Sequence, residues 1–120
     1  MIKLTIKGQL TDLNRYTYAD RSHWSKGAEI KNDDTDACIW QLKKYRHLQL
    51  KGRYHFTFTW FCKDMSVDPD NVCFAKKFVM DGLVKAEVLH DDKWRYVAGF
   101  EDKFEIDAKN PRVEIEITEV

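Results

Sequence analysis

Glycine and proline are scarce in this sequence, with 5 Gly and 2 Pro among 120 residues, which excludes collagen-like and low-complexity chains. Intrinsic disorder is excluded as well, because 43% of the residues are hydrophobic and 13% are aromatic. A chain of this length has room for one domain with a core of its own. We therefore predict a single globular domain spanning residues 1–120.

Long apolar runs are also missing. No stretch approaches the roughly 20 apolar residues that cross a bilayer, and Lys3 and Lys7 interrupt the N-terminal segment, so we expect neither a membrane span nor a secretory signal. Cysteines are few, widely spaced and odd in number (Cys38, Cys62 and Cys73), which argues against a disulfide framework or a zinc ribbon. These absences favour a cytoplasmic protein.

The chain lacks net charge, since 20 Lys and Arg balance 20 Asp and Glu. DNA-binding domains are commonly strongly basic, so the neutral total argues at first against a nucleic-acid partner. The charge is unevenly distributed, however: residues 1–63 carry 12 Lys and Arg against 6 Asp and Glu, and residues 64–120 carry 8 against 14. Either both halves are ordinary solvated surface, or the acidic half binds cations while the basic half contacts phosphate.

The hydrophobic pattern predicts an α+β fold. Alternating apolar and polar residues predict four strands, at 2–7, 54–63, near 93–104 and near 111–119. Helical spacing predicts two helices, one from Asp33 or Asp34 to about residue 48 and one from Pro69 to about residue 86. Residues 9–32 are polar and aperiodic, so we expect a long connection there. The order strand, helix, strand, helix, strand, strand predicts one two-layer domain, with two helices packed on a mixed or antiparallel sheet.

Acidic residues surround both ends of the second predicted helix. Asp68 and Asp70 lie at its start, and Asp91 and Asp92 follow its end. Carboxylates gathered in this way repel one another unless a cation lies between them, and such oxygen ligands suit Mg²⁺. The spacing therefore indicates a divalent-metal site. The structural alternative is that Asp68 caps the helix and Asp70 interacts with its dipole, each contributing well under ~1 kcal/mol.

A polar stripe is also expected along this helix. At about 100° per residue, Asp70, Lys77 and Asp81 would lie within roughly 20° of one another, away from the apolar face of the helix. The structural alternative is an ordinary i,i+4 ion pair between Lys77 and Asp81. The stripe places Lys77, rather than its neighbour Lys76, on the same side as Asp70.

Five short segments, in order along the chain, resemble motifs of the RusA family of Holliday-junction resolvases, which are small metal-dependent endonucleases often carried by phages and prophages. The Leu-Asn-Arg-Tyr sequence at 13–16 is similar to an early Asn-containing segment of the family, and Asp-Pro-Asp-Asn at 68–71 to its D-x-D-N motif. Asp-Gly-Leu at 81–83 is similar to D-[AG]-L, Asp-Asp at 91–92 to a closing acid, and Thr-Glu at 118–119 to a common ending. The resemblance covers nearly the whole chain.

The resemblance assigns a role to individual acids. The metal-binding carboxylates of the family fall on Asp68, Asp70 and Asp92, and Asp91 is a neighbouring candidate ligand. The active-site lysine of the family, four residues before D-[AG]-L, falls on Lys77. The chain has three more residues between Asn71 and Asp81 than the shorter family pattern, so counting forward from Asn71 would put Phe74 at the lysine position. This leaves Lys76 as an alternative to Lys77, and the helical stripe favours Lys77.

The resemblance further implies an activity. The protein is expected to be a Mg²⁺-dependent endodeoxyribonuclease, with Mn²⁺ as a substitute, that resolves four-way DNA junctions by symmetric cleavage in recombination and repair. It is expected to act as a homodimer in the cytoplasm of a bacterial cell or a phage-infected host. The metal would polarise the scissile phosphate and activate a water for in-line attack, while Lys77 would stabilise the developing charge.

DNA contacts are expected from the basic N-terminal half, and we assign them to five residues: Asn14, Arg15, Arg21, Lys26 and Lys31. The competing interpretation is a non-catalytic DNA-binding or phage assembly module on the same fold. The complete set of acids argues against that alternative, because a purely structural protein has little reason to keep it.

Overall fold

The computed structural model of the protein describes residues 1–22 and 24–120, and it describes the side chains of these residues except at 13, 19–25 and 30–32. The helices are α1 (Leu13–Ser22), α2 (Trp24–Leu42), α3 (Pro69–Val72) and α4 (Lys76–Lys85), with 3₁₀ helices η1 (Lys43–Leu48) and η2 (Cys73–Ala75). The strands are β1 (Ile2–Lys7), β2 (Tyr54–Cys62), β3 (Val97–Ile106) and β4 (Arg112–Glu119).

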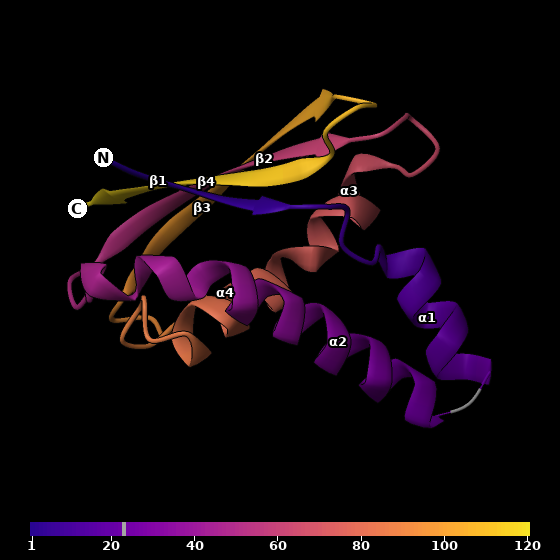
Figure 1. Ribbon diagram of the computed structural model, residues 1–120, viewed down its shortest axis with the longest axis horizontal. Coiled ribbons are helices and arrows are strands. Elements are labelled where there is room, and N and C mark those ends of the chain that lie inside the picture. Colours follow the sequence, from indigo (N-terminus) through magenta and orange to yellow (C-terminus); the bar gives the residue numbers. More distant parts are fainter. Residues whose placement is uncertain (23) are drawn as a thin grey trace.

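The four strands form one mixed sheet in the order β1-β4-β2-β3. β4 pairs antiparallel with both β1 and β2, whereas β2 and β3 are parallel. The helices lie together on one face of this sheet (Figure 1). The predicted two-layer α+β domain with a mixed sheet is therefore confirmed, and β1 and β3 are its two edges.

Strict alternation in β2 builds the core. Its even-numbered residues from Tyr54 to Cys62 are buried, and the residues between them are half-buried on the other face. Phe56 and Phe58 pack with Phe78 of α4 in one cluster of buried residues. Burying a side chain of this size contributes about 1.5–3 kcal/mol, so β2 is the central stabilising element of the sheet.

A glycine sets the distance between the two long helices. A Cβ atom at Gly82 of α4 would lie only 2.7 Å from the Cβ of Cys38 in α2, and 3.4 Å from Cδ1 of Leu42. Any larger residue would therefore push the helices apart. Burial raises the pKa of the Cys38 thiol to about 12, so this cysteine is a neutral core residue.

The expectation of a long connection at 9–32 was wrong, because α1 and most of the first half of α2 occupy it. The carboxylate of Asp12 caps α1 by accepting the backbone N–H of Arg15 at 2.9 Å. Asp34 was expected to cap a helix but lies inside α2, where its carboxylate accepts the N–H of Thr11 at 2.8 Å. Among the helices of the described ranges, none has the length and apolar composition needed to cross a membrane.

The second predicted helix is interrupted. η2 separates α3 from α4 by three residues of 3₁₀ geometry. A 3₁₀ helix turns about 120° per residue instead of about 100°, so three residues shift the phase by roughly 60°. The assumption of one continuous helix from Pro69 to residue 86 was therefore wrong. The shift moves Lys77 from roughly 20° to roughly 40° away from Asp70, and Lys76 from roughly 120° to roughly 60°, so the angle alone separates the two lysines much less clearly.

Candidate active site

A hydrogen-bonded cluster joins the start of α4 to the edge strand β3. Lys76 donates from Nζ to Oδ2 of Asp102 at 2.7 Å, and Trp60 donates from Nε1 to Oδ1 of Asp102 at 2.9 Å. The lysine and the aspartate are each only about one-fifth exposed, at 21% and 22%. An ion pair in this setting is screened less by solvent than a surface pair, so both side chains are held in fixed positions.

Strand register explains why Asp102 lies there. It pairs with Phe58 across the parallel β2–β3 ladder, so both side chains are on the helix-covered face of the sheet. Because β3 is the edge strand, the carboxylate sits at the rim of the core, within reach of Lys76. The ammonium also lies over two aromatic rings, 4.8 Å from the centroid of Phe100 and 5.5 Å from that of Phe58.

The thiol of Cys73 links Asp70 to this cluster. Burial raises the Cys73 pKa, the carboxylates of Asp102 and Asp70 raise it further, and Lys76 lowers it. The same thiol donates to the backbone carbonyl of Asp70 at 3.5 Å. Asp70, Asp102 and Lys76 therefore act electrostatically on one turn, η2.

Lys77 points to a different partner. Its ammonium pairs with Oδ1 of Asp81 at 3.1 Å, in an i,i+4 ion pair, and its side chain is 58% exposed. An exposed pair of this type contributes about 0.3–0.5 kcal/mol. Lys76 is thus paired with Asp102 and Lys77 with Asp81, and the role of either lysine remains a prediction.

Asp68 occupies the cap position of α3 but does not cap with its side chain. Its backbone carbonyl accepts the N–H groups of Asn71 and Val72, whereas its carboxylate makes no capping hydrogen bond. Asp68 and Asp70 are both exposed. Both carboxylates are therefore accessible to a ligand, two residues apart in the chain.

The other two predicted ligands lie after α4. Asp91 accepts the N–H of Asp92 at 2.8 Å, and this hydrogen bond is the main reason that the pKa of Asp91 is lowered. Asp92 lines a groove with Trp94 and Phe100, next to the start of β3. A separate groove beside the end of β3 includes Asp68. The predicted acids are thus distributed along β3 instead of forming a single cluster.

The donor set fits Mg²⁺ only in an open form. No three His, Cys, Asp or Glu side chains in the described part of the chain are close enough to hold a metal ion. Mg²⁺ does not need such a cage, because proteins often bind it through one or two carboxylates, with waters and substrate phosphate oxygens completing the octahedron. The exposed pair Asp68 and Asp70 meets that requirement.

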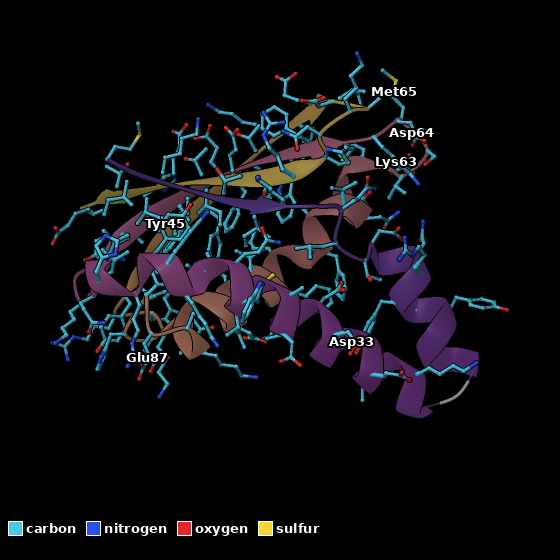
Figure 2. All side chains as sticks on the ribbon, in the orientation of Figure 1. Asp33, Tyr45, Lys63, Asp64, Met65 and Glu87 are labelled. Carbon is cyan, nitrogen blue, oxygen red and sulfur yellow. The ribbon has the colours of Figure 1, made fainter. Side chains whose placement is uncertain are left out.

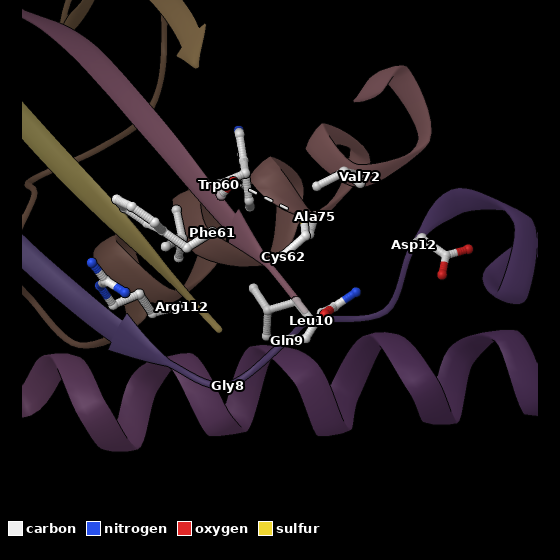
Figure 3. A pocket seen from close by; sticks show the side chains of 11 residues that line it. Gly8, Gln9, Leu10, Asp12, Trp60, Phe61, Cys62, Val72, Ala75 and Arg112 are labelled. Atoms are coloured by element: carbon white, nitrogen blue, oxygen red, sulfur yellow. Dashed lines mark hydrogen bonds between the residues drawn. The ribbon is translucent and has the colours of Figure 1, made fainter. Parts of the chain in front are cut away.

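A small cavity lies close to the cluster but does not offer a substrate site. It is enclosed by the β1–α1 connection, the end of β2 and η2, with Trp60 and Cys62 on its wall (Figure 3). Its volume of about 20 Å³ holds roughly one water molecule. The grooves beside the two ends of β3 are larger and more open than this cavity.

A basic aromatic surface lies at the opposite edge of the sheet. Trp40 is 75% exposed, and the ammonium of Lys43 lies 5.4 Å from the centroid of its ring. A groove between α2 and β1 is lined by Trp40, Lys7 and Lys44. Sequence reasoning missed this surface, because a tryptophan is more often a core residue; the signal was the pair of lysines one helical turn after Trp40.

The predicted DNA-contacting residues are only partly described. Asn14 and Arg15 are exposed on α1, and Lys26 is exposed on α2. The side chains of Arg21 and Lys31 fall outside the described residues. The three described residues remain available to a ligand, and their role remains a prediction.

Comparison with known proteins does not assign this chain to a family. No family model matches this chain. A search of curated proteins also found no match. The assignment of function therefore depends on the residues and on their placement.

Proposed function

We propose that this protein is a divalent-metal-dependent endonuclease that cleaves four-way DNA junctions. The observation that carries the proposal is the pair of exposed acids Asp68 and Asp70 at the start of α3, a few residues before Lys76, whose ammonium is held by Asp102 at the edge strand β3. The ordered motifs that resemble RusA resolvases supply the substrate class. Its place of action would be the cytoplasm of a bacterium or of a phage-infected cell.

The chemistry divides between the acids and the lysine. Asp68 and Asp70 would hold Mg²⁺, or Mn²⁺ in its place, which supplies charge neutralisation at the scissile phosphate and a more acidic water. Asp92 and Asp91, farther along β3, would contribute to a second cation position or orient waters. Lys76 would stabilise the negative charge that develops on the phosphate, because its ammonium is fixed and partly shielded from solvent.

Two residues would act through Lys76 instead of touching the substrate. Asp102 fixes the direction of the ammonium, and Trp60 fixes the carboxylate of Asp102 through its indole N–H. Both are positioning residues. Their arrangement limits Lys76 to a small range of positions before DNA binds, which lowers the cost of ordering it in the transition state.

DNA binding would use positive charge away from these acids. The basic aromatic surface of Trp40, Lys43 and Lys44 combines a ring that a base can stack on with ammonium groups for phosphates. The exposed Arg15 and Lys26 would extend the contact. A homodimer would present two such surfaces and two acidic sites to a junction with two-fold symmetry.

The second candidate is a non-catalytic DNA-binding or phage assembly module. The observation that favours it is the absence of a preformed three-ligand metal cluster in the described part of the chain. Such a module would bind junctions through the basic aromatic surface and would have no need of Asp68 or Asp70.

Cleavage of a synthetic four-way junction separates the two candidates. The purified protein is incubated with labelled junction, and with linear duplex of the same sequence, in Mg²⁺, Mn²⁺, Ca²⁺ or EDTA. We expect paired, symmetric cuts in the junction with Mg²⁺ or Mn²⁺ and none with EDTA. Junction binding without any cut in every metal would favour the non-catalytic module, and no binding at all would reject both.

A further inference from the structure

A polar groove lies at the end of the molecule where β2 begins. It has a volume of about 350 Å³ and lies between the segment that joins η1 to β2 and the segment that follows α4. These two segments run side by side (Figure 1), and a parallel bridge joins Leu50 to Leu89. Arg46, Lys51 and His90 are the basic residues of its lining. The groove shares no lining residue with the Trp40 groove or with the two grooves beside β3.

The chain around this groove is strongly basic. Residues 43–53 carry five Lys and Arg and one His, and no Asp or Glu. Within the described ranges of the chain, the ammonium of Lys51 has no ion-pair partner, and the ring nitrogens of His90 have no hydrogen-bond partner. The His90 ring packs against Tyr96, with the ring centroids 5.4 Å apart. The N–H donors of Lys51 and His90 are therefore available to a ligand.

The backbone acceptors beside the groove are already used. The N–H and the carbonyl of Leu50 are both bonded across it, at 2.8 and 2.9 Å. The side chain of Gln49 donates from Nε2 to the carbonyls of Arg46 and Glu87, at 2.7 and 3.2 Å. Carbonyl oxygens bonded in this way are less available to a cation. The groups left to bind a ligand are mainly donors, which suits an anion.

Two strained residues meet at the groove. Gln49 and Glu87 have the left-handed backbone that favours glycine, with φ of 45° and 62°. Both side chains make contacts that glycine could not make, since Gln49 donates the two hydrogen bonds above and the Glu87 carboxylate forms an ion pair with Arg46. Glu87 lies on the side of the helical layer away from the sheet (Figure 2). Backbone strain of this kind is common at ligand sites.

We propose that this groove binds a phosphate group of the DNA backbone. Arg46 and Lys51 are the charged donors, and His90 donates a ring N–H, which the imidazole has in either charge state. The choice of DNA as the ligand rests on the proposed function, whereas the chemistry of the groove specifies only a phosphate group.

Two placements favour DNA as the source of the phosphate. The helix η1 carries Arg46 together with Lys43 and Lys44 of the basic aromatic surface. On the other side of the groove, Asp92 follows His90 by two residues and lines the groove at the start of β3. The phosphate groove therefore adjoins both the basic aromatic surface and the predicted acids.

Glu87 occupies Arg46 when no phosphate is bound. Carboxylate and phosphate oxygens bind a guanidinium in the same forked geometry. The side chains of Arg46 and Glu87 are 64% and 59% exposed, and an ion pair this exposed is weak, so a phosphate can displace the carboxylate. Glu87 is thus a competitor of DNA for Arg46.

Variants of the donors and of the competitor should change DNA affinity in opposite directions. The affinity for a labelled four-way junction is measured by fluorescence anisotropy in Ca²⁺, without Mg²⁺ or Mn²⁺, across a salt series. Arg46→Ala and Lys51→Ala should each weaken binding at least about threefold, and their double variant should flatten the plot of log affinity against log salt by roughly one unit, for one lost phosphate contact. Glu87→Gln should tighten binding about threefold. Lys85→Ala is the matched control and should bind as the wild type does, because Lys85 is exposed in the last turn of α4 but does not line the groove.

A double-variant cycle separates competition from a general effect of charge. In the Arg46→Ala background, Glu87→Gln should have almost no effect, because the carboxylate then has no guanidinium to occupy. An equal gain in both backgrounds would overturn the role of Glu87. Wild-type affinity in both Arg46→Ala and Lys51→Ala would overturn DNA binding by the groove.

Inorganic phosphate is the second probe, because it tests the groove without DNA. Phosphate should shift the amide NMR signals of residues 46–51 and 87–90 in the wild type, and not in the Arg46→Ala/Lys51→Ala variant. Such shifts, without an effect of the variants on the junction, would overturn DNA as the ligand and assign the groove to a free phosphate compound. No shifts and no effect on the junction would overturn the site. Cleavage is not measured, so a protein that binds junctions through this groove but cuts none would reject the nuclease proposal alone.

Discussion

The two edges of the sheet differ in whether side chains bond the backbone N–H and carbonyl groups that have no neighbouring strand. At β1, Gln41 of α2 bonds both the N–H and the carbonyl of Lys7, at 2.7 and 2.9 Å. Tyr45, which extends from η1 to β1 (Figure 2), accepts the N–H of Thr5 at 3.3 Å. Side chains thus replace the missing strand neighbour at β1. The structure shows no such cover at β3 among the described residues, which leaves that edge free to bind a strand or a polymer.

The edges also differ in charge. Lys3 and Lys7 lie on β1, whereas Glu101, Asp102 and Glu105 lie on β3. The opposite charges of the two halves of the sequence therefore become a separation across the sheet. A neutral protein can in this way offer phosphate-attracting and cation-attracting surfaces at once.

The largest expected effect is at the acidic edge. Asp70→Asn keeps the size of the side chain and removes its charge, so we expect cleavage of a four-way junction to fall on the order of 10²-fold or more, with junction binding retained. Asp64→Asn is the control, because Asp64 is an exposed acid in the loop that leads to α3, where its carboxylate accepts a hydrogen bond from the Ser66 hydroxyl. Near-normal cleavage by Asp70→Asn would remove this residue from the site.

The two adjacent lysines provide the next test. We expect Lys76→Ala to lower cleavage by about 10²-fold, because it removes an ammonium that Asp102 holds in a fixed position, and Lys77→Ala to change it by less than about threefold. Single-turnover rates at saturating enzyme would separate chemistry from binding. The opposite ranking would restore the original assignment of Lys77. Asp102→Asn should give an intermediate loss, with a changed pH profile, because it acts through Lys76.

At the basic edge we expect an effect on affinity, not on chemistry. Trp40→Ala combined with Lys43→Ala and Lys44→Ala should weaken junction binding and flatten the plot of log affinity against log salt by roughly one unit per lost phosphate contact. Trp94→Ala is the matched control, since Trp94 is also strongly exposed but lies near β3.

The DNA-contacting residues that were predicted from the sequence are tested with a separate variant. Alanine at Arg15, Arg21, Lys26 and Lys31 should flatten the same salt dependence if α1 and α2 contribute phosphate contacts. If this variant alone changes the slope, the DNA surface follows the helices and not the Trp40 groove. An unchanged slope in both variants would place the DNA elsewhere.

The smallest effect concerns the outer face beside β1. Hydrogen bonds from Arg112 lower the pKa of Asp107, and those from Lys3 and then Arg112 lower the pKa of Glu114. Because both pKa values are lowered in the folded state, their stabilisation is complete at neutral pH and is lost as the pH falls through the folded-state pKa. Arg112→Gln should therefore destabilise the protein at neutral pH and make little difference in acid. Urea unfolding of both proteins across pH would check this, and a difference that grows in acid would contradict it.

The local sequence pattern was sufficient to predict some strands and helices and not others. The strand at 2–7 was predicted correctly, and the one at 54–63 to within one residue of β2, because one face of each is buried and period-two alternation records that burial directly. The helices within 9–32 were missed, because their stability comes from packing against each other and from the Asp12 cap rather than from an apolar stripe. Asp12, placed three residues before Arg15, was the available signal.

The site depended on contacts that no local pattern contains. Asp102 is 26 residues from Lys76 and 42 residues from Trp60 in the chain. Its role emerges only when the parallel pairing of β2 and β3 is known. The 3₁₀ helix η2 could not be predicted from the sequence either, because Cys73, Phe74 and Ala75 fit an ordinary α-helix as well as a 3₁₀ turn.

The close contact at Gly82 sets the position of the whole of α4, including its first residue. Lys76, the first residue of α4, is six residues away, which is about 9 Å along a rigid helix. Adding a single methyl group at Gly82 would tilt or slide the whole helix against α2, and the displacement would reach the ammonium at its far end. The accuracy with which Lys76 meets Asp102 is therefore decided deep in the core, at a position remote from the surface.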